Sequence, residues 1–285
     1  MRMPNLNFMV RVSQLRAIQA RYEEPDCRNP DDAAERLLPF AHRCSCMVRG
    51  RLFMGRMRAQ PFYPFLLART RYYDRVFLDA IEAGVGSIVN IGCGSDTRAE
   101  RFRLGLIQRG IQVLECDQAE AIEVKRRVAT RSFGQNTQLS YQAIDLNDED
   151  WPALRKWLDA KRSSKVLVML EGVSPYVNTH SFESFLYFLH AHLAAGSLLV
   201  YDFKHDAAPR DFGRSARTQQ PFRLRADRDA VAAFHALRGW QLEAYETSTE
   251  LTQRLAARLA SLARPAFDED CLIRLSRAGR KVQPW

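Results

Sequence analysis

The chain has 285 residues, of which 46% are hydrophobic and 26% charged, a balance typical of globular proteins that excludes a disordered or fibrous class. No apolar run approaches the roughly 20 residues of a membrane-crossing helix, so we expect no membrane span. Residues 1–16 lack an uninterrupted apolar stretch and carry Arg2 and Arg11, which disfavours a signal peptide. The six cysteines are therefore expected as thiols in a reducing compartment, the cytoplasm.

The net charge of +9 is concentrated at the front of the chain. Residues 1–75 hold fourteen arginines and seven acids, a net of +7, whereas residues 76–285 hold 28 bases and 26 acids, a net of +2. This concentration of positive charge can attract an anionic partner, a nucleic acid included. It can also belong to a solvated or structural face. No RNA-binding signature is present, which disfavours nucleic acid. We expect an anionic small-molecule or peptide partner and no membrane partner.

Before residue 87 the pattern predicts helices and irregular segments, with negligible strand content. Residues 31–38 are expected to begin a helix, and Gly50, Pro61 and Pro64 are expected to break the helical stretch after it. We therefore divide the chain into a helical N-terminal cap that forms a substrate lid, residues 1–80, and a main domain that holds the cofactor, residues 81–285.

From residue 87 onward, short β-branched or aliphatic runs alternate with amphipathic stretches. This alternation predicts an α/β, Rossmann-like fold with a mostly parallel sheet and helices on both faces. The expected strands are 87–91, 112–116, 138–144, 165–170, 197–203, 241–246 and 272–276. The expected helices are 98–109, 119–130, 149–160, 179–195, 226–237 and 251–263. Thr179 or Ser181 is expected to cap the fourth of these helices.

The first expected strand runs into a turn with two glycines, Gly92 and Gly94. Gly92 permits a backbone conformation closed to other residues, and Gly94 lets a ligand approach the main chain. Thr97 stands where a dinucleotide fingerprint needs its third glycine, and no Walker lysine follows. Asp96 would repel a pyrophosphate but suits S-adenosylmethionine, a cation without phosphates. A tight turn without any ligand is the alternative.

Three acids end three successive expected strands. Asp117 is placed to accept hydrogen bonds from ribose hydroxyls. Asp145 could accept from an adenine amino group, and Glu171 would lie at the cleft. Each acid alone could be a helix cap, but together the three predict a nucleoside-binding cleft.

The chain resembles the leucine carboxyl methyltransferase family of class I S-adenosylmethionine-dependent methyltransferases, including its bacterial branch. The similarity extends from about Val12 to Phe203. Its motifs are 20–36 (ARYEEPDCRNPDDAAER), 68–74 (ARTRYYD), 90–98 (NIGCGSDTR), Asp117 with Lys125, Asp145–Leu146, and 170–177 (LEGVSPYV). The two-glycine turn followed by the Leu-Glu-Gly-Val motif is much more specific than a glycine pair.

The resemblance implies a seven-stranded sheet with an antiparallel last strand, and methyl transfer to a carboxylate or another oxygen of a small molecule or peptide in secondary metabolism. A carboxylate acceptor is ionised at pH 7, so no metal and no strong base is expected. Arg69 matches a residue near the methionine carboxylate and the acceptor carboxylate, and Tyr176 one that faces the acceptor; both are the expected catalytic residues. The implied S-adenosylmethionine-binding residues are Arg69, Gly92, Gly94, Asp96, Asp117, Gln118, Asp145, Leu146 and Glu171.

The chain departs from the family's pattern at the cofactor turn, where Asn90 and Cys93 replace the usual leucine and alanine or glycine. The members that modify a protein phosphatase use an N-terminal lysine, whereas the first lysine here is Lys125. Arg21 or Arg36 would have to substitute for it. These departures leave methyl transfer intact and disfavour a phosphatase substrate.

Several alternatives stay open. If the acceptor is a phenol or an alcohol, His180 or His205 would be the base to suspect. His42, Cys44 and Cys46 could form half a metal site, but no second pair stands at zinc spacing. The function could also be protein C-terminal carboxyl or RNA-base methylation, or S-adenosylmethionine binding without catalysis. Sequence does not identify the acceptor, and the cap residues expected to select it include Phe62, Phe65 and the arginines.

Overall fold

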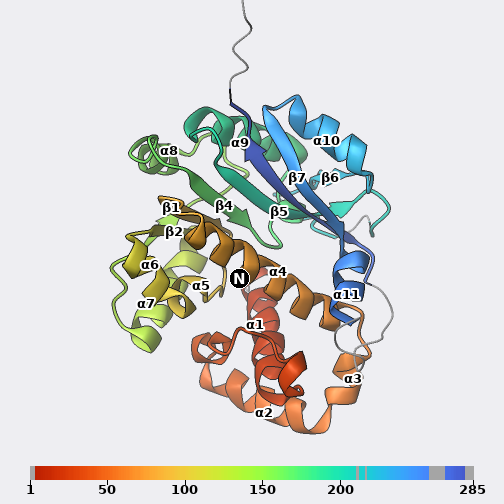
Figure 1. Ribbon diagram of the computed structural model, residues 1–285. Helices are drawn as coiled ribbons and strands as arrows, with labels where there is room; N and C mark the ends of the chain where they lie inside the picture. Colours follow the sequence, from red (N-terminus) through yellow and green to blue (C-terminus); the bar gives the residue numbers. More distant parts are fainter. Residues whose placement is uncertain (1–3, 210–211, 216, 257–266, 280–285) are drawn as a thin grey trace, which may run out of the picture.

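The computed structural model describes residues 4–209, 212–215, 217–256 and 267–279. A central sheet has the strand order β3-β2-β1-β4-β5-β8-β7, and β6 pairs with β5 outside this path (Figure 1). The strands are β1 (Ser87–Ile91), β2 (Gln112–Asp117), β3 (Leu139–Ala143), β4 (Val166–Leu170), β5 (Leu198–His205), β6 (Arg223–Leu224), β7 (Trp240–Thr247) and β8 (Asp270–Arg277).

The strand directions agree with the predicted α/β class. The pairs β1–β2, β1–β4, β2–β3 and β4–β5 are parallel, whereas β8 runs antiparallel to both of its neighbours, β5 and β7. All seven expected strands are present, and the reversed last strand is confirmed. The expected count of seven strands is one too low, because the two-residue β6 makes the sheet eight-stranded. A pair of residues is too short to show a periodic pattern.

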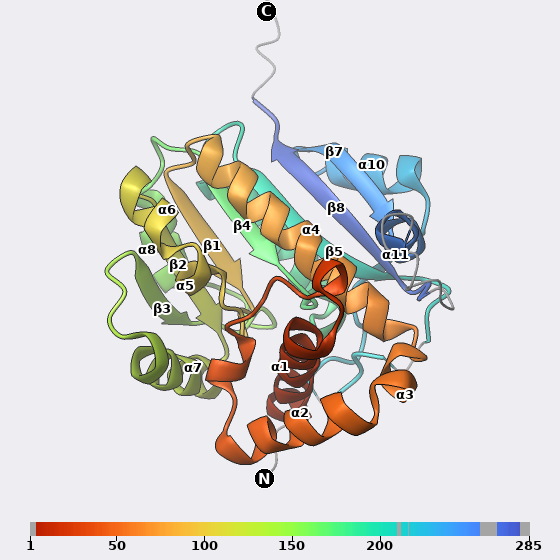
Figure 2. The ribbon, with the colours of Figure 1, turned by 60° about the horizontal axis from the view of Figure 1, so that its bottom comes forward.

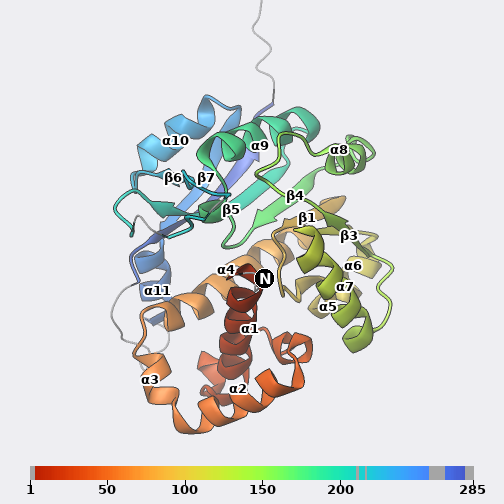
Figure 3. The ribbon, with the colours of Figure 1, turned by 180° about the vertical axis from the view of Figure 1, so that it is seen from behind.

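Helices pack on both faces of the sheet. Figure 2 shows α4 (Phe62–Glu82) lying over β4 and β5. Its buried side chains share a core with alternate residues of the strands, together with α6 (Arg103–Arg109) and α11 (Ser248–Ala256). The other alternate residues pack against α8 (Pro152–Asp159), α9 (Thr179–His192) and α10 (Arg228–Ala236) (Figure 3). β1 and β4 are buried along their whole length, as expected for strands covered on both faces.

The N-terminal helices gather at the end of the sheet toward which the arrowheads of β1 and β4 point (Figure 2). They are α1 (Pro4–Tyr22), α2 (Phe40–Leu52) and α3 (Met54–Arg58), with short 3-10 turns at Pro25–Cys27 and Ala34–Leu37. A small core of their own includes Ile18, Cys46 and Met57. The division into a cap of residues 1–80 and a main domain of 81–285 stays a prediction.

Two expected helix breakers do not break a helix. Gly50 lies inside α2, where a Cβ atom would overlap the Tyr22 ring, so glycine allows α1 and α2 to pack closely. Pro64 lies in the first turn of α4, where its missing N–H has no partner to lose. Pro61 does precede a helix, at the N-cap of α4.

Three further helix predictions differ from the structure. The helix expected over 98–109 is divided at Phe102 into α5 (Arg98–Arg101) and α6. The segment 31–38 forms only the 3-10 turn at Ala34–Leu37, and the N-cap of α9 is Asn178 rather than Thr179 or Ser181. The other helices of the main domain form, among them α7 (Ala119–Phe133). Residues 257–263 of the last expected helix lie outside the described residues.

The described part of the chain has neither a membrane-spanning helix nor a cluster of metal-binding side chains. No helix there has the length and apolarity to cross a membrane. No group of three or more His, Cys, Asp or Glu side chains there is arranged to hold a metal ion.

Candidate active site

The glycine turn follows β1 directly and has the backbone that glycine allows. Gly92 and Gly94 both have positive φ, 63° and 46°. A Cβ atom on Gly92 would overlap a methyl carbon of Val173, so a side chain there would clash. The Gly94 N–H donates a hydrogen bond of 2.7 Å to Asp117 at the end of β2. The turn is therefore held against the second strand.

Asp117 organises the backbone around it. Its two carboxylate oxygens accept from the N–H groups of Gly94 at 2.7 Å and Gln118 at 2.8 Å. A carboxylate offers about four lone-pair sites, so two stay available to a ligand. Burial raises the pKa of the Asp117 carboxyl, against the lowering effect of these hydrogen bonds.

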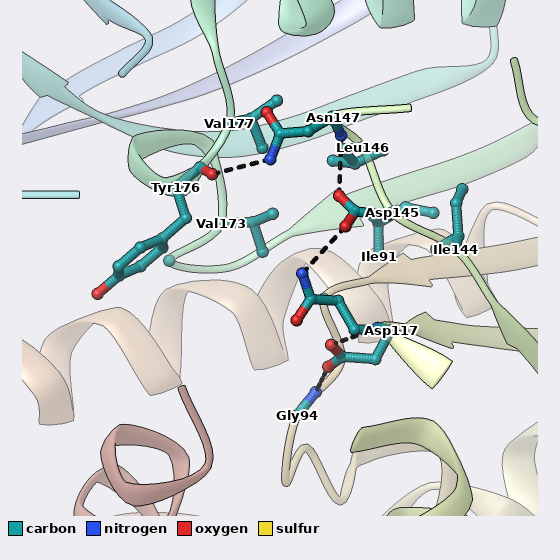
Figure 4. A pocket seen from close by; sticks show the side chains of 13 residues that line it. Ile91, Gly94, Asp117, Ile144, Asp145, Leu146, Asn147, Val173, Tyr176 and Val177 are labelled. Carbon is teal, nitrogen blue, oxygen red and sulfur yellow. Dashed lines mark hydrogen bonds between the residues drawn. The ribbon is translucent and has the colours of Figure 1, made fainter. Parts of the chain in front are cut away.

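Asp145 follows β3 on the opposite side of the same space (Figure 4). It accepts from the Gln118 side chain at 3.2 Å and from the Asn147 N–H at 3.0 Å, and it forms an ion pair of 2.7 Å with Arg217. The side-chain amide of Asn147 in turn donates to the Tyr176 backbone carbonyl at 3.3 Å. This chain of hydrogen bonds joins the ends of β2, β3 and β4.

These residues enclose a cavity of about 130 Å³, which we call the first cavity. Seven of the predicted site residues line it, and the charged side chains among the described lining are both acidic. The side chains that sequence missed are mostly apolar, and such residues give no individual signal. The lining is Ile91, Gly92, Gly94, Asp117, Gln118, Ile144, Asp145, Leu146, Asn147, Gly172, Val173, Tyr176 and Val177.

Asp96 does not line the first cavity but lies buried beside it. Its carboxylate accepts from the Asn90 side chain at 3.0 Å and from the Arg98 N–H at 2.7 Å, and it pairs with the Arg98 guanidinium at 2.5 Å. Burial opposes ionisation, but the positive charges of Arg98, Lys125 and Arg16 outweigh it and hold the pKa of Asp96 below its usual range. Asp96 supports the turn from behind, and direct contact with a cofactor stays a prediction.

Glu171, directly after β4, binds three arginines. Its oxygens lie 2.9 Å from Arg16 of α1, 3.2 Å from Arg69 of α4 and 2.8 Å from Arg98 of α5. Burial opposes ionisation here too, but the three guanidinium groups lower the pKa of Glu171 to about 2. One carboxylate therefore connects the N-terminal helices to the sheet, and a cofactor contact by Glu171 stays a prediction.

A second cavity of about 340 Å³ lies next to the first. The two share Gly172 and Tyr176, which form the wall between them. Most of the second lining comes from α4, from the ends of β5 and β8 and from the adjacent loops. It consists of Phe62, Arg69, Gly172, Pro175, Tyr176, Asp202, Phe203, Lys204, Pro209, Phe212, Phe267, Glu269 and Asp270.

The two predicted catalytic residues both line the second cavity. The Arg69 guanidinium lies 3.2 Å from Glu171 and 3.2 Å from Asp202, and it contacts the ring of Phe62 at 5.8 Å. Burial raises the pKa of Tyr176 to about 12, so its phenol is protonated near neutral pH. Sequence did not indicate Asp202, because a single acid within the buried strand β5 resembles any structural ion-pair partner.

The alternative residues lie elsewhere. His180 is exposed, His205 contacts the Asp268 carbonyl at 3.0 Å, and neither lines the two cavities. Arg21 pairs with Glu35 near the surface. Arg36 donates to the carbonyl of Ser132, and Cys46 donates to the Gln14 carbonyl at 3.7 Å within the cap core.

Many cap arginines have structural partners. Arg58 pairs with Glu23 at 2.6 Å, Arg43 donates to the carbonyls of Leu38 and Arg36 at 2.8 Å, and Arg71 donates to the carbonyls of Asp26 and Arg28. Arg16 and Arg69 are buried in the Glu171 cluster. Among the three interpretations of the basic front, these contacts favour a structural one for at least these side chains.

Comparison with known proteins agrees with the geometry. The model of the leucine carboxyl methyltransferase family matches residues 9–190. A protein of Mycobacterium avium (strain 104) named for S-adenosyl-L-methionine-dependent methyltransferase activity is 34% identical over 144 residues, which cover 50% of this chain and 47% of that one. A Mycobacteroides abscessus protein of the same name is 31% identical over 172 residues, covering 58% and 53%. The chain thus spans about half the length of these curated relatives.

Two solved methyltransferase structures are also similar to this chain, at low identity. Magnesium protoporphyrin IX methyltransferase from Synechocystis has a TM-score of 0.46 and 11% identity, covering 88% of this chain and 96% of that one. A Mesorhizobium loti S-adenosylmethionine-dependent methyltransferase has a TM-score of 0.46 and 20% identity, covering 70% and 96%. The assignment rests on the family match, which covers more than half of the chain. The chain belongs to the leucine carboxyl methyltransferase family.

Proposed function

We propose that this chain is an S-adenosylmethionine-dependent methyltransferase that methylates an oxygen atom of a small molecule or peptide. The observation that carries the proposal is the pair of cavities that meet at Gly172 and Tyr176. The first has the features of a nucleoside site, and the second opens beside it with room for an acceptor. Two adjoining sites are what a direct transfer between two bound molecules requires.

The residues of the first cavity fit the cofactor. Asp117 has lone pairs available for ribose hydroxyls, and Ile91, Ile144 and Val173 offer apolar contact to an adenine ring. Asp145 and Asn147 place polar groups at the far side, where an adenine amino group could bond. The described lining holds two acids and no cation, which suits a sulfonium and disfavours a pyrophosphate.

The bound cofactor would supply an activated methyl group for an in-line displacement. The protein's contribution is then alignment, which can lower a barrier by about 7–11 kcal/mol when the reacting groups are well oriented. In the wall between the two cavities, Gly172 contributes backbone alone because it has no side chain, and Tyr176 borders both cavities. We assign Tyr176 to orientation of the acceptor oxygen and Arg69 to the wall of its cavity.

Cofactor binding and methyl release test the proposal in order. Calorimetric titration with S-adenosylmethionine and with S-adenosylhomocysteine should show one site per chain. Incubation with S-adenosylmethionine labelled on its methyl group and a panel of hydroxyl and carboxyl compounds should then yield a labelled product. Failure to bind either cofactor form would overturn the proposal, and binding without turnover on any acceptor would favour a non-catalytic binding module.

A further inference from the structure

The second cavity contains cations whose charge is already neutralised. Lys204 of β5 lies opposite Asp270 of β8 in the antiparallel register, and its ammonium pairs with Asp270 at 2.8 Å and Glu269 at 2.7 Å. Arg69 pairs in the same way with Glu171 and Asp202. Each of the two cations in the described lining therefore has two carboxylate partners.

The charge balance of that lining is negative. Three acids, Asp202, Glu269 and Asp270, face two bases, Arg69 and Lys204. A carboxylate that entered would add a further negative charge and would find both bases occupied. Moving an ionised carboxylate into such surroundings is unfavourable unless a new partner compensates its charge.

Aromatic rings form most of the remaining wall. The rings of Phe62 and Phe267 meet edge to face with centroids 5.5 Å apart, and the ring centroids of Tyr176 and Phe212 lie 5.6 Å apart. The Lys204 ammonium lies 4.5 Å from the centre of the Phe212 ring and 4.6 Å from that of Phe267, so even this charge is covered by ring faces. Such walls favour a flat, apolar ligand.

We propose that the second cavity takes an uncharged aromatic acceptor that bears a hydroxyl group, and that Asp202 receives the hydroxyl proton. This inference rests on the proposed methyl transfer and narrows its acceptor. It departs from the carboxylate acceptor that the family resemblance implies. Arg69 then acts as a positioning residue that holds Asp202 and Glu171 rather than as a clamp on the acceptor.

Asp202 is the lining carboxylate bonded to the wall between the cavities. One of its oxygens accepts the Gly172 N–H at 2.6 Å, and the other accepts from Arg69 at 3.2 Å. The Tyr73 hydroxyl, which lies 3.0 Å from the Leu170 carbonyl, is 3.4 Å from the Asp202 oxygen that accepts from Gly172. Burial raises the pKa of Asp202 and the Asp270 carboxylate adds to this despite Arg69, which makes Asp202 a stronger base than an exposed aspartate. The charged and titratable groups around it are Arg69, Tyr72 and Tyr73 of α4, Glu171, Tyr176 and Asp270.

The step balances without a metal or a redox partner. The acceptor oxygen forms a bond to the methyl carbon as the bond between that carbon and sulfur breaks. The electron pair of the broken bond stays on sulfur, which changes from a sulfonium to a neutral thioether. The hydroxyl proton passes to Asp202, and from there to water after the methyl ether leaves.

Binding of matched probes tests the acceptor class. In the presence of S-adenosylhomocysteine, 2-naphthol and 2-naphthoate have nearly the same shape but differ in charge at neutral pH. We expect 2-naphthol to bind at least about tenfold more tightly, and Phe212→Ser to weaken it while S-adenosylhomocysteine affinity is unchanged. Absence of 2-naphthol binding, or equal or tighter binding of 2-naphthoate, would overturn the inference. If the unmodified chain does not bind S-adenosylhomocysteine, the proposed function itself would be overturned.

Turnover of naphthols of different acidity tests the proton acceptor. Asp202→Asn should lower kcat for 2-naphthol by about 10²–10⁴, the usual contribution of a general base. For a nitro-substituted naphthol, which ionises near neutral pH without a base, the same substitution should lower kcat much less. Asp159→Asn, an exposed acid on α8, is the matched control and should leave both rates unchanged.

The two naphthols also separate a chemical role from a structural one. A variant that binds S-adenosylhomocysteine normally and loses the same factor for both naphthols would show that Asp202 is structural and would overturn its assignment. If Asp202→Asn does not fold, the dependence of unmodified kcat on naphthol acidity decides the matter. If Asp202 accepts the proton, un-ionised 2-naphthol should be methylated near neutral pH. Methylation of the ionised form alone would overturn the assignment of Asp202.

Discussion

The two cavities differ in where the chain supplies their walls. All thirteen residues that line the first lie between Ile91 and Val177, inside the range matched by the family model. Eight of the thirteen that line the second, from Asp202 to Asp270, lie beyond residue 190, where that match ends. The part of the chain matched by the family model therefore lines the first cavity, the proposed cofactor site, while the later part supplies most of the second cavity, the proposed acceptor site.

The largest predicted effect is on stability and concerns Glu171, which connects the N-terminal helices to the sheet through its ion pairs. Glu171→Gln would leave the buried guanidinium groups of Arg16, Arg69 and Arg98 short of a counter-charge. Removing one partner of a buried ion pair costs about 3–5 kcal/mol, and urea unfolding should show a loss of this size. Glu123→Gln, which removes an exposed pair with Arg126, should change stability little; an equally small change at Glu171 would contradict the prediction.

Acid should reveal the same cluster without a mutation. The folded-state pKa of Glu171 is lowered from 4.5 to about 2, so its ionised form stabilises the fold fully above the unfolded value. This contribution should be lost as pH falls from about 4.5 to about 2, and Asp96 adds to it in the same direction. Unfolding free energy measured across this range should fall more steeply for the unmodified chain than for Glu171→Gln, and parallel curves would exclude the cluster as the cause.

Asp117→Ala should affect the first cavity alone. The loss of ribose hydrogen bonds should weaken S-adenosylhomocysteine binding by about 1–3 kcal/mol. Calorimetry measures this change, and Glu120→Ala, an exposed acid nearby on α7, serves as the control. Unchanged affinity would refute the ribose contact, whereas weakened 2-naphthol binding with normal cofactor affinity would show that the cavities are not as separate as their linings indicate.

Arg69→Lys should have an effect similar in size to that of Asp117→Ala, but on the second cavity. Lysine keeps the charge but not the planar fork that spans Glu171 and Asp202. Loss of one charge-assisted hydrogen bond, about 1.5–3 kcal/mol, corresponds to roughly a tenfold or greater fall in kcat. Steady-state kinetics at saturating cofactor measure it. Full activity in this variant would show that the fork has no role in positioning Asp202.

Sequence predicted the parts of this molecule that depend on local chemistry. The strands follow from their apolar runs, and the turn at Gly92 and Gly94 follows from backbone freedom that glycine alone provides. Asp117 and Asp145 could be placed because each follows a strand whose end points to the same edge. These inferences need no knowledge of distant contacts.

The remaining features depend on contacts between distant segments. The surroundings of Glu171 and Asp96 are set by arginines up to 155 residues away along the chain, which the local sequence does not indicate. Gly50 was expected to break a helix, and its reason is instead the approach of Tyr22. Nothing in the local sequence of Phe212, Phe267 or Asp270 indicates that these residues line one cavity, because the sheet order brings them together.

The reversed strand β8 has an evolutionary consequence. Because it runs against β5, its beginning rather than its end lies at the edge that carries the second cavity, and it brings Asp270 there opposite Lys204. The segment that leads into a strand can change in length or composition without altering the strands of the cofactor half. Substitution of residues such as Phe267 and Glu269, just before β8, would therefore alter the second cavity while the strands beside the first cavity stay the same.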